Sequence, residues 1–257
     1  MSTGCAVRFL GTGTSHGVPM IGCRCDTCRS PDPRDRRSRP SILFELENGV
    51  RVLVDTTPDL RSQALAHDLD RVDAILFTHC HADHVMGLDE VRRFNVLQRA
   101  AIPCYGDADT LKEVRRTFAY IFESNDEGGG IPLLDLHALD GPVSIGGETF
   151  TPVPVWHGRR RILGFRVRNF AYLTDCSGIP DTSWPLLEGL DTLAIDALRH
   201  RPHPTHFTVE QAVGVSARLA PRRTWLTHIC HDLPHAATND SLPPGVEMAY
   251  DGLRIDI

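Results

Sequence analysis

The chain has 257 residues, of which 41% are hydrophobic and 23% charged, so it can bury a full core as one large domain or two small ones. Its formal net charge of −6 argues against a general nucleic-acid binder. No stretch approaches the apolar length of a membrane span, which argues against a membrane protein.

The N-terminal segment predicts a strand and a tight turn. Residues 1–8 lack a charged region that leads into an apolar core, so no signal peptide is expected. We therefore predict a cytoplasmic protein whose eight cysteines are thiols or metal ligands rather than disulfides. Residues 6–10 predict a short strand that enters the turn Gly11-Thr-Gly13. This turn is not a P-loop, because no Gly-Lys-Ser/Thr follows it.

Three cysteines follow at short spacing: Cys23, Cys25 and Cys28. Thiolates so close together suit a closed tetrahedral zinc site, which needs a fourth ligand from elsewhere in the chain. The alternative is a set of unliganded surface thiols. The next segment, residues 29–40, is polar and broken by prolines, and it predicts a solvated loop.

The following segments predict a strand pair, a helix and a buried strand. Residues 41–46 and 51–55 predict two strands around a turn. Asp55 ends the second strand, and we expect it to orient a metal-bound histidine from behind. Residues 59–67 predict a short helix, and the apolar run at residues 72–77 is typical of a buried strand.

Three histidines and an aspartate lie within six positions after that strand: His79, His81, Asp83 and His84. Neutral imidazole and carboxylate are good ligands for zinc or manganese, and a divalent ion would offset the cost of holding them together. His79 and His81 stand two apart, so an extended loop projects both to one side, where they can share an ion. Asp83 and His84 lie on the next bend and can serve a second ion. The alternative is a solvated histidine-rich loop.

The pattern His79-x-His81-x-Asp83-His84, followed by Gly87, resembles the signature of the metallo-β-lactamase superfamily of hydrolases. The resemblance implies an α/β fold: a four-layer αββα sandwich of two mixed β-sheets, with helices on both outer faces and a metal site on one edge. We expect a single domain of this kind over residues 1–257, with a zinc-binding cysteine loop at about residues 23–28.

Two helices are predicted on either side of a strand at residues 102–105. The first spans residues 89–100 and should pack Val91, Phe94, Val96 and Leu97 on a sheet face. The second spans residues 108–122. Residues 123–130 predict a flexible loop without a chemical role.

Three later residues of metal-ligand type each follow an apolar run: His157, Asp175 and His228. One such residue would be a weak signal, but three of them complete the ligands that two ions need. We interpret Asp175 as a bridge between two sites, one formed by His79, His81 and His157, the other by Asp83, His84 and His228. Two divalent ions, Zn²⁺ or Mn²⁺, held about 3.5–4 Å apart can clamp a phosphoryl group and generate hydroxide between them.

His231 lies three positions after His228, just past the end of its strand. It is therefore free to reach another site, and we predict that it is the fourth ligand of a structural Zn²⁺ held by Cys23, Cys25 and Cys28. Cys230 is the chemical competitor, but its position would demand another backbone direction.

The entry turn Gly11-Thr-Gly13, the cysteine loop and the pair His228-x-x-His231 together resemble the PhnP-type phosphodiesterases. That family opens 5-phosphoribosyl 1,2-cyclic phosphate to ribose 1,5-bisphosphate in the carbon–phosphorus lyase pathway of phosphonate use. The resemblance covers nearly the whole chain. It implies a metal-dependent hydrolase of small-molecule phosphodiesters, and it suggests a homodimer.

The same resemblance implies a histidine general acid on the loop that follows a strand ending near Asp196. His206 matches best, because it directly precedes a helix whose start is marked by a capping box at Thr208 and Gln211. The loop is shorter than in the family, which leaves His203 as an alternative. Protonation of a leaving group by such a histidine typically contributes about 10²–10⁴-fold.

The arginine run at residues 159–161 follows His157 and offers partners for a 5-phosphate, although a solvated turn is an equal alternative. We count Asp83 and His206 as catalytic residues. Three other functions compete: a ribonuclease Z-type tRNA endonuclease, a thioesterase of the glyoxalase II type, and a non-catalytic metal-binding sensor. The acidic net charge and the absence of an obvious insertion for a tRNA-binding arm argue against the ribonuclease Z type. A thioesterase of the glyoxalase II type would not need the cysteine site.

Overall fold

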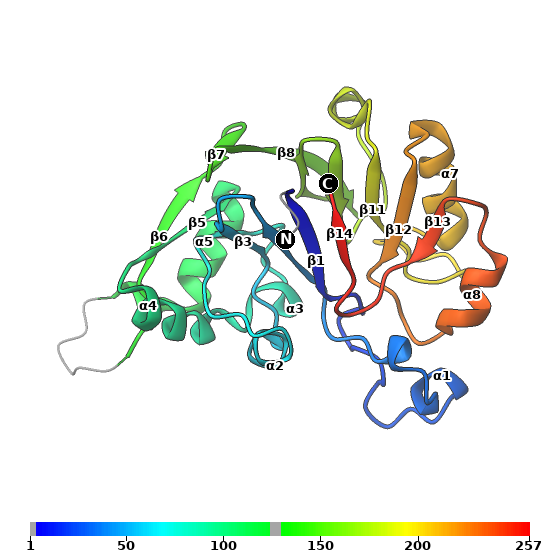
Figure 1. Cartoon of the computed structure of the whole chain (residues 1–257), viewed down its shortest axis with the longest axis horizontal. Helices are drawn as coiled ribbons and strands as arrows, with labels where there is room; N and C mark the ends of the chain where they lie inside the picture. Colours follow the sequence, from blue (N-terminus) through cyan, green and yellow to red (C-terminus); the bar gives the residue numbers. More distant parts are fainter. Residues whose placement is uncertain (1–3, 124–129) are drawn as a thin grey trace.

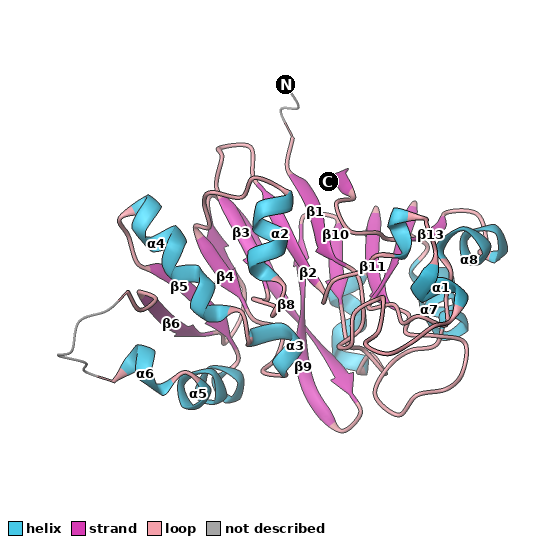
Figure 2. Cartoon of the chain, turned by 90° about the horizontal axis from the view of Figure 1, so that it is seen from below, coloured by secondary structure: helices cyan, strands magenta, loops and turns pink. Residues whose placement is uncertain are grey.

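Two seven-stranded sheets pack face to face, with helices on both outer sides, in the computed structural model of the chain (Figures 1 and 2). The structure describes residues 4–123 and 130–257, so most of the loop expected at residues 123–130 lies outside the described residues. The expected four-layer α/β sandwich is confirmed.

The first sheet is antiparallel from β14 to β3 and parallel from β3 to β6. Its strands, in spatial order, are β14 (Arg254–Asp256), β1 (Ala6–Gly11), β2 (Ser41–Glu45), β3 (Arg51–Val54), β4 (Ala74–Leu76), β5 (Ile102–Gly106) and β6 (Leu134–Ala138). The pairing of β1 with β14 brings the two ends of the chain close together (Figure 1).

The second sheet has the same mixed character. Strands β7 to β10 are antiparallel, and β10 to β13 are parallel. In spatial order they are β13 (Val246–Met248), β12 (Arg223–Thr227), β11 (Thr192–Asp196), β10 (Phe170–Leu173), β9 (Arg160–Val167), β8 (Glu148–His157) and β7 (Val143–Ile145). The parallel strands of both sheets direct their carboxyl ends, and the loops that follow them, to one edge of the sandwich.

The helices divide between the two outer faces (Figure 1). On the first sheet lie α2 (Leu60–Ala66), α3 (Ala82–Val85), the 3₁₀ helix η2 (Leu88–Val91), α4 (Arg92–Gln98), α5 (Ala108–Thr117) and α6 (Ala119–Phe122). With the second sheet lie η3 (Asp181–Leu187), α7 (Val209–Leu219) and α8 (His235–Ser241), while α1 (Asp26–Arg29) and η1 (Pro33–Asp35) belong to the cysteine loop. No helix in the described ranges has the length and apolar character needed to cross a membrane.

Two predicted helices are each divided in the structure. The helix expected at residues 89–100 is η2 followed by α4, and the helix expected at residues 108–122 is α5 followed by α6, with a break at Phe118. The expectation that Val96 packs on the sheet is wrong, because its side chain is 63% exposed. At 100° per residue, Val96 lies about 200° around the helix from the buried Phe94, which places it on the opposite face. Leu97 is also largely exposed.

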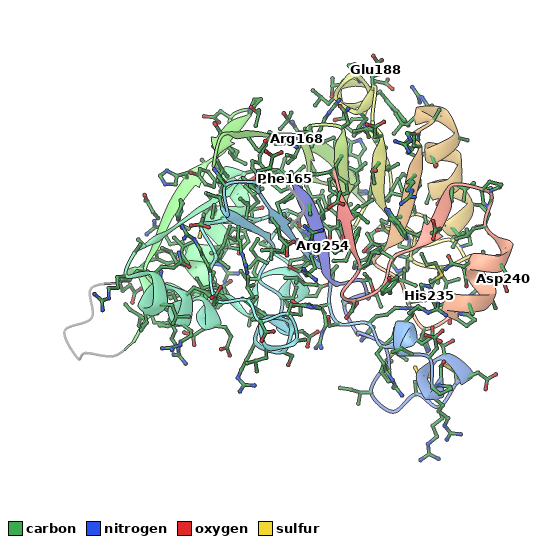
Figure 3. All side chains as sticks on the ribbon, viewed as in Figure 1. Phe165, Arg168, Glu188, His235, Asp240 and Arg254 are labelled. Carbon is green, nitrogen blue, oxygen red and sulfur yellow. The ribbon has the colours of Figure 1, made fainter. Side chains whose placement is uncertain are left out.

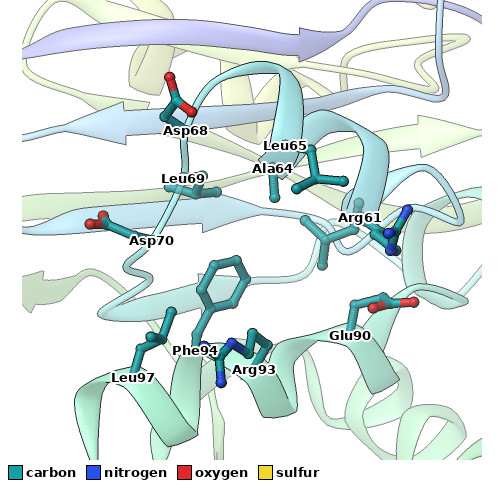
Figure 4. A pocket seen from close by; sticks show the side chains of 11 residues that line it. Arg61, Ala64, Leu65, Asp68, Leu69, Asp70, Glu90, Arg93, Phe94 and Leu97 are labelled. Carbon is teal, nitrogen blue, oxygen red and sulfur yellow. The ribbon is translucent and has the colours of Figure 1, made fainter.

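Leu97 and Phe94 lie beside a cavity of about 460 Å³ between α2 and α4 (Figure 4). Apolar side chains such as Leu65 and Leu69 form its walls, and Arg61 and Glu90 stand at its rim. The cavity lies on the outer helical face of the first sheet, away from the edge where the ligand-type residues meet.

The core between the sheets is built on aromatic side chains from alternate strand positions. The ring of Phe44 meets Phe150 and Phe170 edge to face, at centroid distances of 5.2 and 5.8 Å. Phe165 lies in the same layer, whereas Glu188 and Asp240 reach the periphery of the molecule (Figure 3). Burial of each such ring contributes about 1.5–3 kcal/mol. These contacts hold the two sheets face to face. They therefore also hold in place the edge that both sheets share.

The capping box expected at the start of α7 is present: the hydroxyl of Thr208 accepts the Gln211 amide at 3.2 Å, and the Gln211 side chain accepts the Thr208 amide at 2.9 Å. We expect Thr208→Ala to lower the free energy of unfolding by about 1 kcal/mol in urea denaturation. Thr208→Ser keeps the capping oxygen and should keep most of the stability. Equal losses in both variants would show that the cap is not the cause.

Candidate metal centre and active site

The ligand-type residues of both sheets meet at the ends of five strands. Asp55 follows β3, and the segment from His79 to His84 follows β4. His157 ends β8, Asp175 comes just after β10, and His228 comes directly after β12. Residues separated by up to about 170 positions therefore gather at one edge, because the strands that carry them lie close together in the two packed sheets.

Three of these residues have a left-handed backbone. The φ angles of Asp55, Asp175 and His228 are 64°, 53° and 57°. Non-glycine residues rarely adopt this conformation, which costs on the order of 1–3 kcal/mol at each position and is concentrated at functional sites. This backbone conformation interrupts the alternation of side chains along the strand. Each of the three side chains is thereby directed to the edge that both sheets share.

The first cluster contains the three histidines expected on one ion. His79, His81 and His157 each offer a ring nitrogen, and these atoms lie within 4.8 Å of one another. The ring centroids are 4.5 Å apart for His79 and His81, and 5.0 Å apart for His81 and His157. The extended loop does direct both residues of the His-x-His pair to one side.

The second cluster contains Asp83, His84, Asp175 and His228, again with ligand atoms within 4.8 Å of one another. The Asp175 carboxylate lies 3.1 Å from Nε2 of His84 and 3.3 Å from Nε2 of His228. It also lies 3.9 Å from Nε2 of His79 in the first cluster. Asp175 therefore stands between the two clusters, where the bridging residue was expected.

The donor set fits divalent cations. Nε2 of His79, His84 and His228 is buried and has no hydrogen-bond partner within residues 4–123 and 130–257. A buried polar atom without a partner costs about 1–3 kcal/mol, so such atoms call for an explanation. Three of them converge on the Asp175 carboxylate, and imidazole and carboxylate are the ligands that zinc and manganese prefer.

The second ring nitrogens of His84 and His157 are held by the surrounding structure, whereas Nδ1 of His228 has no hydrogen-bond partner among the described residues. Nδ1 of His84 lies 2.7 Å from Oδ2 of Asp55, which is the orienting role expected for that residue. Nδ1 of His157 donates to the carbonyl oxygens of Asp175 and Thr205, both at 2.9 Å. These bonds fix each ring so that Nε2 is free for a metal. The Asp55 carboxylate is held in turn by the amide and the hydroxyl of Thr78.

Burial and neighbouring carboxylates act in opposite directions on these histidines. Burial lowers the pKa of His79, His81 and His157, which favours the neutral form that binds metal. Burial also opposes charge on His84, but the carboxylates of Asp175 and Asp55 raise the pKa of His84 above its ordinary value. The carboxylates of the second cluster therefore favour positive charge at this position, which suits a cation.

His206 lies beside both clusters and pairs with a residue that had no predicted role. Its Nδ1 is 2.7 Å from Oδ2 of Asp196, at the end of β11, and this carboxylate also accepts the Cys176 amide. A ring nitrogen of His206 lies within 4.8 Å of ligand atoms of His157 and Asp175. Because Nδ1 faces Asp196, Nε2 is the nitrogen left for a substrate. One feature of the sequence could have revealed this role: Asp196 stands at the end of a predicted strand, as Asp55 does.

His203, the alternative to His206, lies further from the clusters. It is half-buried, and its Nδ1 is 3.2 Å from the hydroxyl of Thr205. Its ring contacts that of His206 at a centroid distance of 5.0 Å, but within the described residues it joins none of the groups that could hold a metal. The geometry therefore favours His206 as the residue that meets a substrate.

The cysteine loop meets His231 as expected. Nδ1 of His231 lies 3.2, 3.4 and 3.7 Å from the Sγ atoms of Cys23, Cys25 and Cys28. Nitrogen and sulfur ligands of one tetrahedral zinc lie about 3.6 Å apart, given bond lengths of about 2.1 and 2.3 Å. The four side chains therefore fit a zinc ion. Cys230 is not among them; its sulfur accepts the Asp232 amide instead.

Comparison with known proteins agrees with this geometry. A family model described as the β-lactamase superfamily domain matches residues 50–229, a range that includes every residue of the two histidine–aspartate clusters. The chain belongs to the metallo-β-lactamase superfamily. This superfamily fold implies that divalent metal is bound, and the matched range leaves the cysteine loop outside it.

One solved relative of this metallo-β-lactamase superfamily chain is a diphosphatase from the PhnP family. It superposes with a TM-score of 0.92 at 44% identity and covers 98% of each chain, which confirms the expected likeness to PhnP-type enzymes. The Zn²⁺-bound PqqB from Methylobacterium extorquens has a TM-score of 0.82 at 20% identity, with 98% and 100% of the two chains covered, and shows the shared fold.

A curated relative is the octanoyltransferase of Porphyromonas gingivalis, which is 38% identical over 250 residues. The match covers 96% of this chain but 50% of that protein, so the chain spans about half the length of this relative. Taken together, the comparisons identify a hydrolase of the metallo-β-lactamase fold that is related to a PhnP-family diphosphatase.

Proposed function

We propose that this hydrolase is a metal-dependent phosphodiesterase that opens cyclic phosphodiesters, with 5-phosphoribosyl 1,2-cyclic phosphate as the first candidate substrate. The observation that carries the proposal is the Asp196–His206 pair beside two ligand clusters that share Asp175. Ions bound at these clusters would supply Lewis-acid stabilisation of the phosphoryl charge and lower the pKa of the attacking water.

The residues of the chain have separate tasks in this reaction. Asp83 has a carboxylate oxygen 3.5 Å from Nε2 of His84 and 3.8 Å from Nε2 of His228, so it can orient the attacking water and accept its proton. Burial lowers the pKa of His206 to about 3, so the ring is neutral before substrate binds. A bound phosphate anion favours the protonated ring. Nε2 takes up a proton from solvent in the substrate complex, where Asp196 stabilises the imidazolium, and then donates that proton to the departing oxygen.

The PhnP-family relative supports a second candidate, the hydrolysis of a diphosphate. The two reactions differ in the leaving group. A sugar oxygen that departs from a phosphodiester is strongly basic and needs a proton, whereas a departing phosphate group is a far weaker base. A histidine held by a buried carboxylate next to the clusters is therefore of more use for a phosphodiester.

Phosphorus NMR of the manganese-loaded protein with 5-phosphoribosyl 1,2-cyclic phosphate, and with ADP in parallel, tests the proposal. We expect ring opening, and we expect His206→Ala to slow it by about 10²–10⁴-fold. His203→Ala is the matched control and should stay close to the wild type. Turnover of ADP alone would replace the proposal with a diphosphatase. Turnover of neither substrate by fully metal-loaded protein would favour the sensor.

The name of the Porphyromonas gingivalis relative does not change this proposal. It describes a protein of which half lies outside the matched region, and the clusters here suit phosphoryl transfer. Two further expectations stay predictions: a homodimer, which analytical ultracentrifugation would test, and a structural Zn²⁺ in addition to two catalytic ions.

A further inference from the structure

A cavity of about 1150 Å³ opens beside the first ligand cluster. Its lining includes Cys80, His81, Lys112, Asp140, Arg160 and Arg161. Its size is sufficient for a phosphorylated sugar or a nucleotide. A substrate whose reactive phosphorus lies at the clusters would therefore place the rest of its structure here.

The β8–β9 hairpin places one arginine of the run at residues 159–161 on the face of the clusters. Gly158, with a φ of 62°, and Arg159 form a two-residue turn of the kind that needs a positive φ at its first position. This turn makes Arg160 the cross-strand partner of His157, so the two side chains share a face. Arg161 pairs with Trp156 and leaves the opposite face of the strand, although it also lines the cavity.

Arg160 has an unusual environment for a surface arginine. Its Nη1 donates to Sγ of Cys80 at 3.2 Å, between the two histidines of the His-x-His pair. Within the described residues no carboxylate lies within 4 Å of it, whereas Arg168, for example, is paired with Glu47 and Glu148. Sulfur is a weak acceptor, and this one contact engages a single N–H group, so most of the five donors of the guanidinium stay available for an anion.

The acidic residues of the same cavity do not prevent anion binding. Asp107 is the N-cap of α5, where its carboxylate accepts the Thr110 amide at 2.7 Å. Glu113 is paired with Arg116. Asp109 and Asp140 have no ion-pair partner within residues 4–123 and 130–257, and a free carboxylate is a good acceptor for sugar hydroxyl groups. The cavity thus offers a cation near the clusters and a hydroxyl acceptor further along its wall.

We propose that Arg160, positioned by Cys80, binds a second phosphate of the substrate, so that the enzyme prefers sugar phosphodiesters carrying a further phosphate monoester. This inference rests on the proposed phosphodiesterase function and extends it to the substrate class. Arginine binds phosphate through two parallel N–H donors, which lysine cannot reproduce. A charged hydrogen-bonded contact of this type should be worth about 10–100-fold in kcat/KM.

The test compares Arg160→Gln with the wild type on three substrates. These are 5-phosphoribosyl 1,2-cyclic phosphate, ribose 1,2-cyclic phosphate without the 5-phosphate, and bis(p-nitrophenyl) phosphate. We expect a loss of about 10–100-fold on the first substrate, mainly in KM, and little change on the other two. Arg160→Lys should recover part of the loss. Arg222→Gln, an exposed arginine on the loop before β12, is the charge-matched control.

A binding measurement separates this inference from the proposed function. Ribose 5-phosphate titrated calorimetrically into metal-free protein should bind about 10-fold more weakly to Arg160→Gln than to the wild type. Equal binding, or an equal loss on all three substrates, would overturn the role of Arg160. Failure of the wild type to hydrolyse any of the three would instead overturn the phosphodiesterase, whatever the calorimetry shows.

Discussion

Asp175→Asn should abolish hydrolysis, with kcat/KM reduced by about 10³-fold or more. Among the residues that the structure describes, Asp175 is the one carboxylate within 4 Å of ring nitrogens from both clusters, those of His79, His84 and His228. Asparagine keeps the shape but removes the negative charge that two cations would share. It also tolerates the left-handed backbone of this position, so the fold should survive. Metal content by mass spectrometry, kcat/KM and circular dichroism together check the result.

Asp55→Asn should cause a smaller loss of activity than Asp175→Asn. Asp55 touches Nδ1 of His84 rather than a metal position, and loss of such an orienting partner typically reduces metal affinity or activity by about 10–100-fold. Asp240→Asn, on the exposed side of α8, should leave both quantities unchanged (Figure 3). Full activity and full metal occupancy in Asp175→Asn would contradict its place as the bridge. A loss in Asp55→Asn as large as that in Asp175→Asn would mean that the two residues act in the same way.

Three of the residues that the structure brings to the shared edge have one property in common: each follows an apolar run. His157, Asp175 and His228 were found in this way, because a buried strand must end at a sheet edge and parallel strands end at the same edge. The meeting of His231 with three distant cysteines was also predictable, because zinc chemistry demands a fourth ligand.

The contacts that the sequence did not reveal depend on how the folded chain aligns its residues in space. Asp196 and His206 are ten positions apart in a loop, and only the folded loop brings their side chains together. Arg160 and Arg161 are equivalent in a sequence, but the two-residue turn at Gly158 decides which of them faces the clusters. The exposure of Val96 is a different case, because the periodicity of one helix already places a residue two positions from the buried Phe94 on the opposite face.

The cysteine loop is tied to the active site through the segment that follows β12. His228 contributes to the second cluster, and His231, three positions later, meets the cysteines. Arg37 holds the backbone of the segment that follows His228. Its side chain is 2% exposed and donates to the carbonyl oxygens of Cys230 and Leu233 at 3.0 and 2.7 Å. Asp35 accepts from Arg37 at 2.8 Å and compensates its charge. A zinc ion in the loop would therefore hold the backbone that positions His228.

Cys23→Ser should remove one zinc per chain and lower the melting temperature by roughly 8–16 °C. A ligand that binds only the folded state adds about 4 kcal/mol when its concentration is a thousand times Kd, and each kcal/mol shifts the melting of a chain of this size by about 2–4 °C. Cys230→Ser is the matched control, because the Cys230 sulfur accepts the Asp232 amide and a serine hydroxyl can do the same. Calorimetry and metal analysis at fixed free zinc measure both. Loss of zinc in Cys230→Ser but not in Cys23→Ser would reverse the ligand assignment, and unchanged zinc and melting in Cys23→Ser would remove that cysteine from the site.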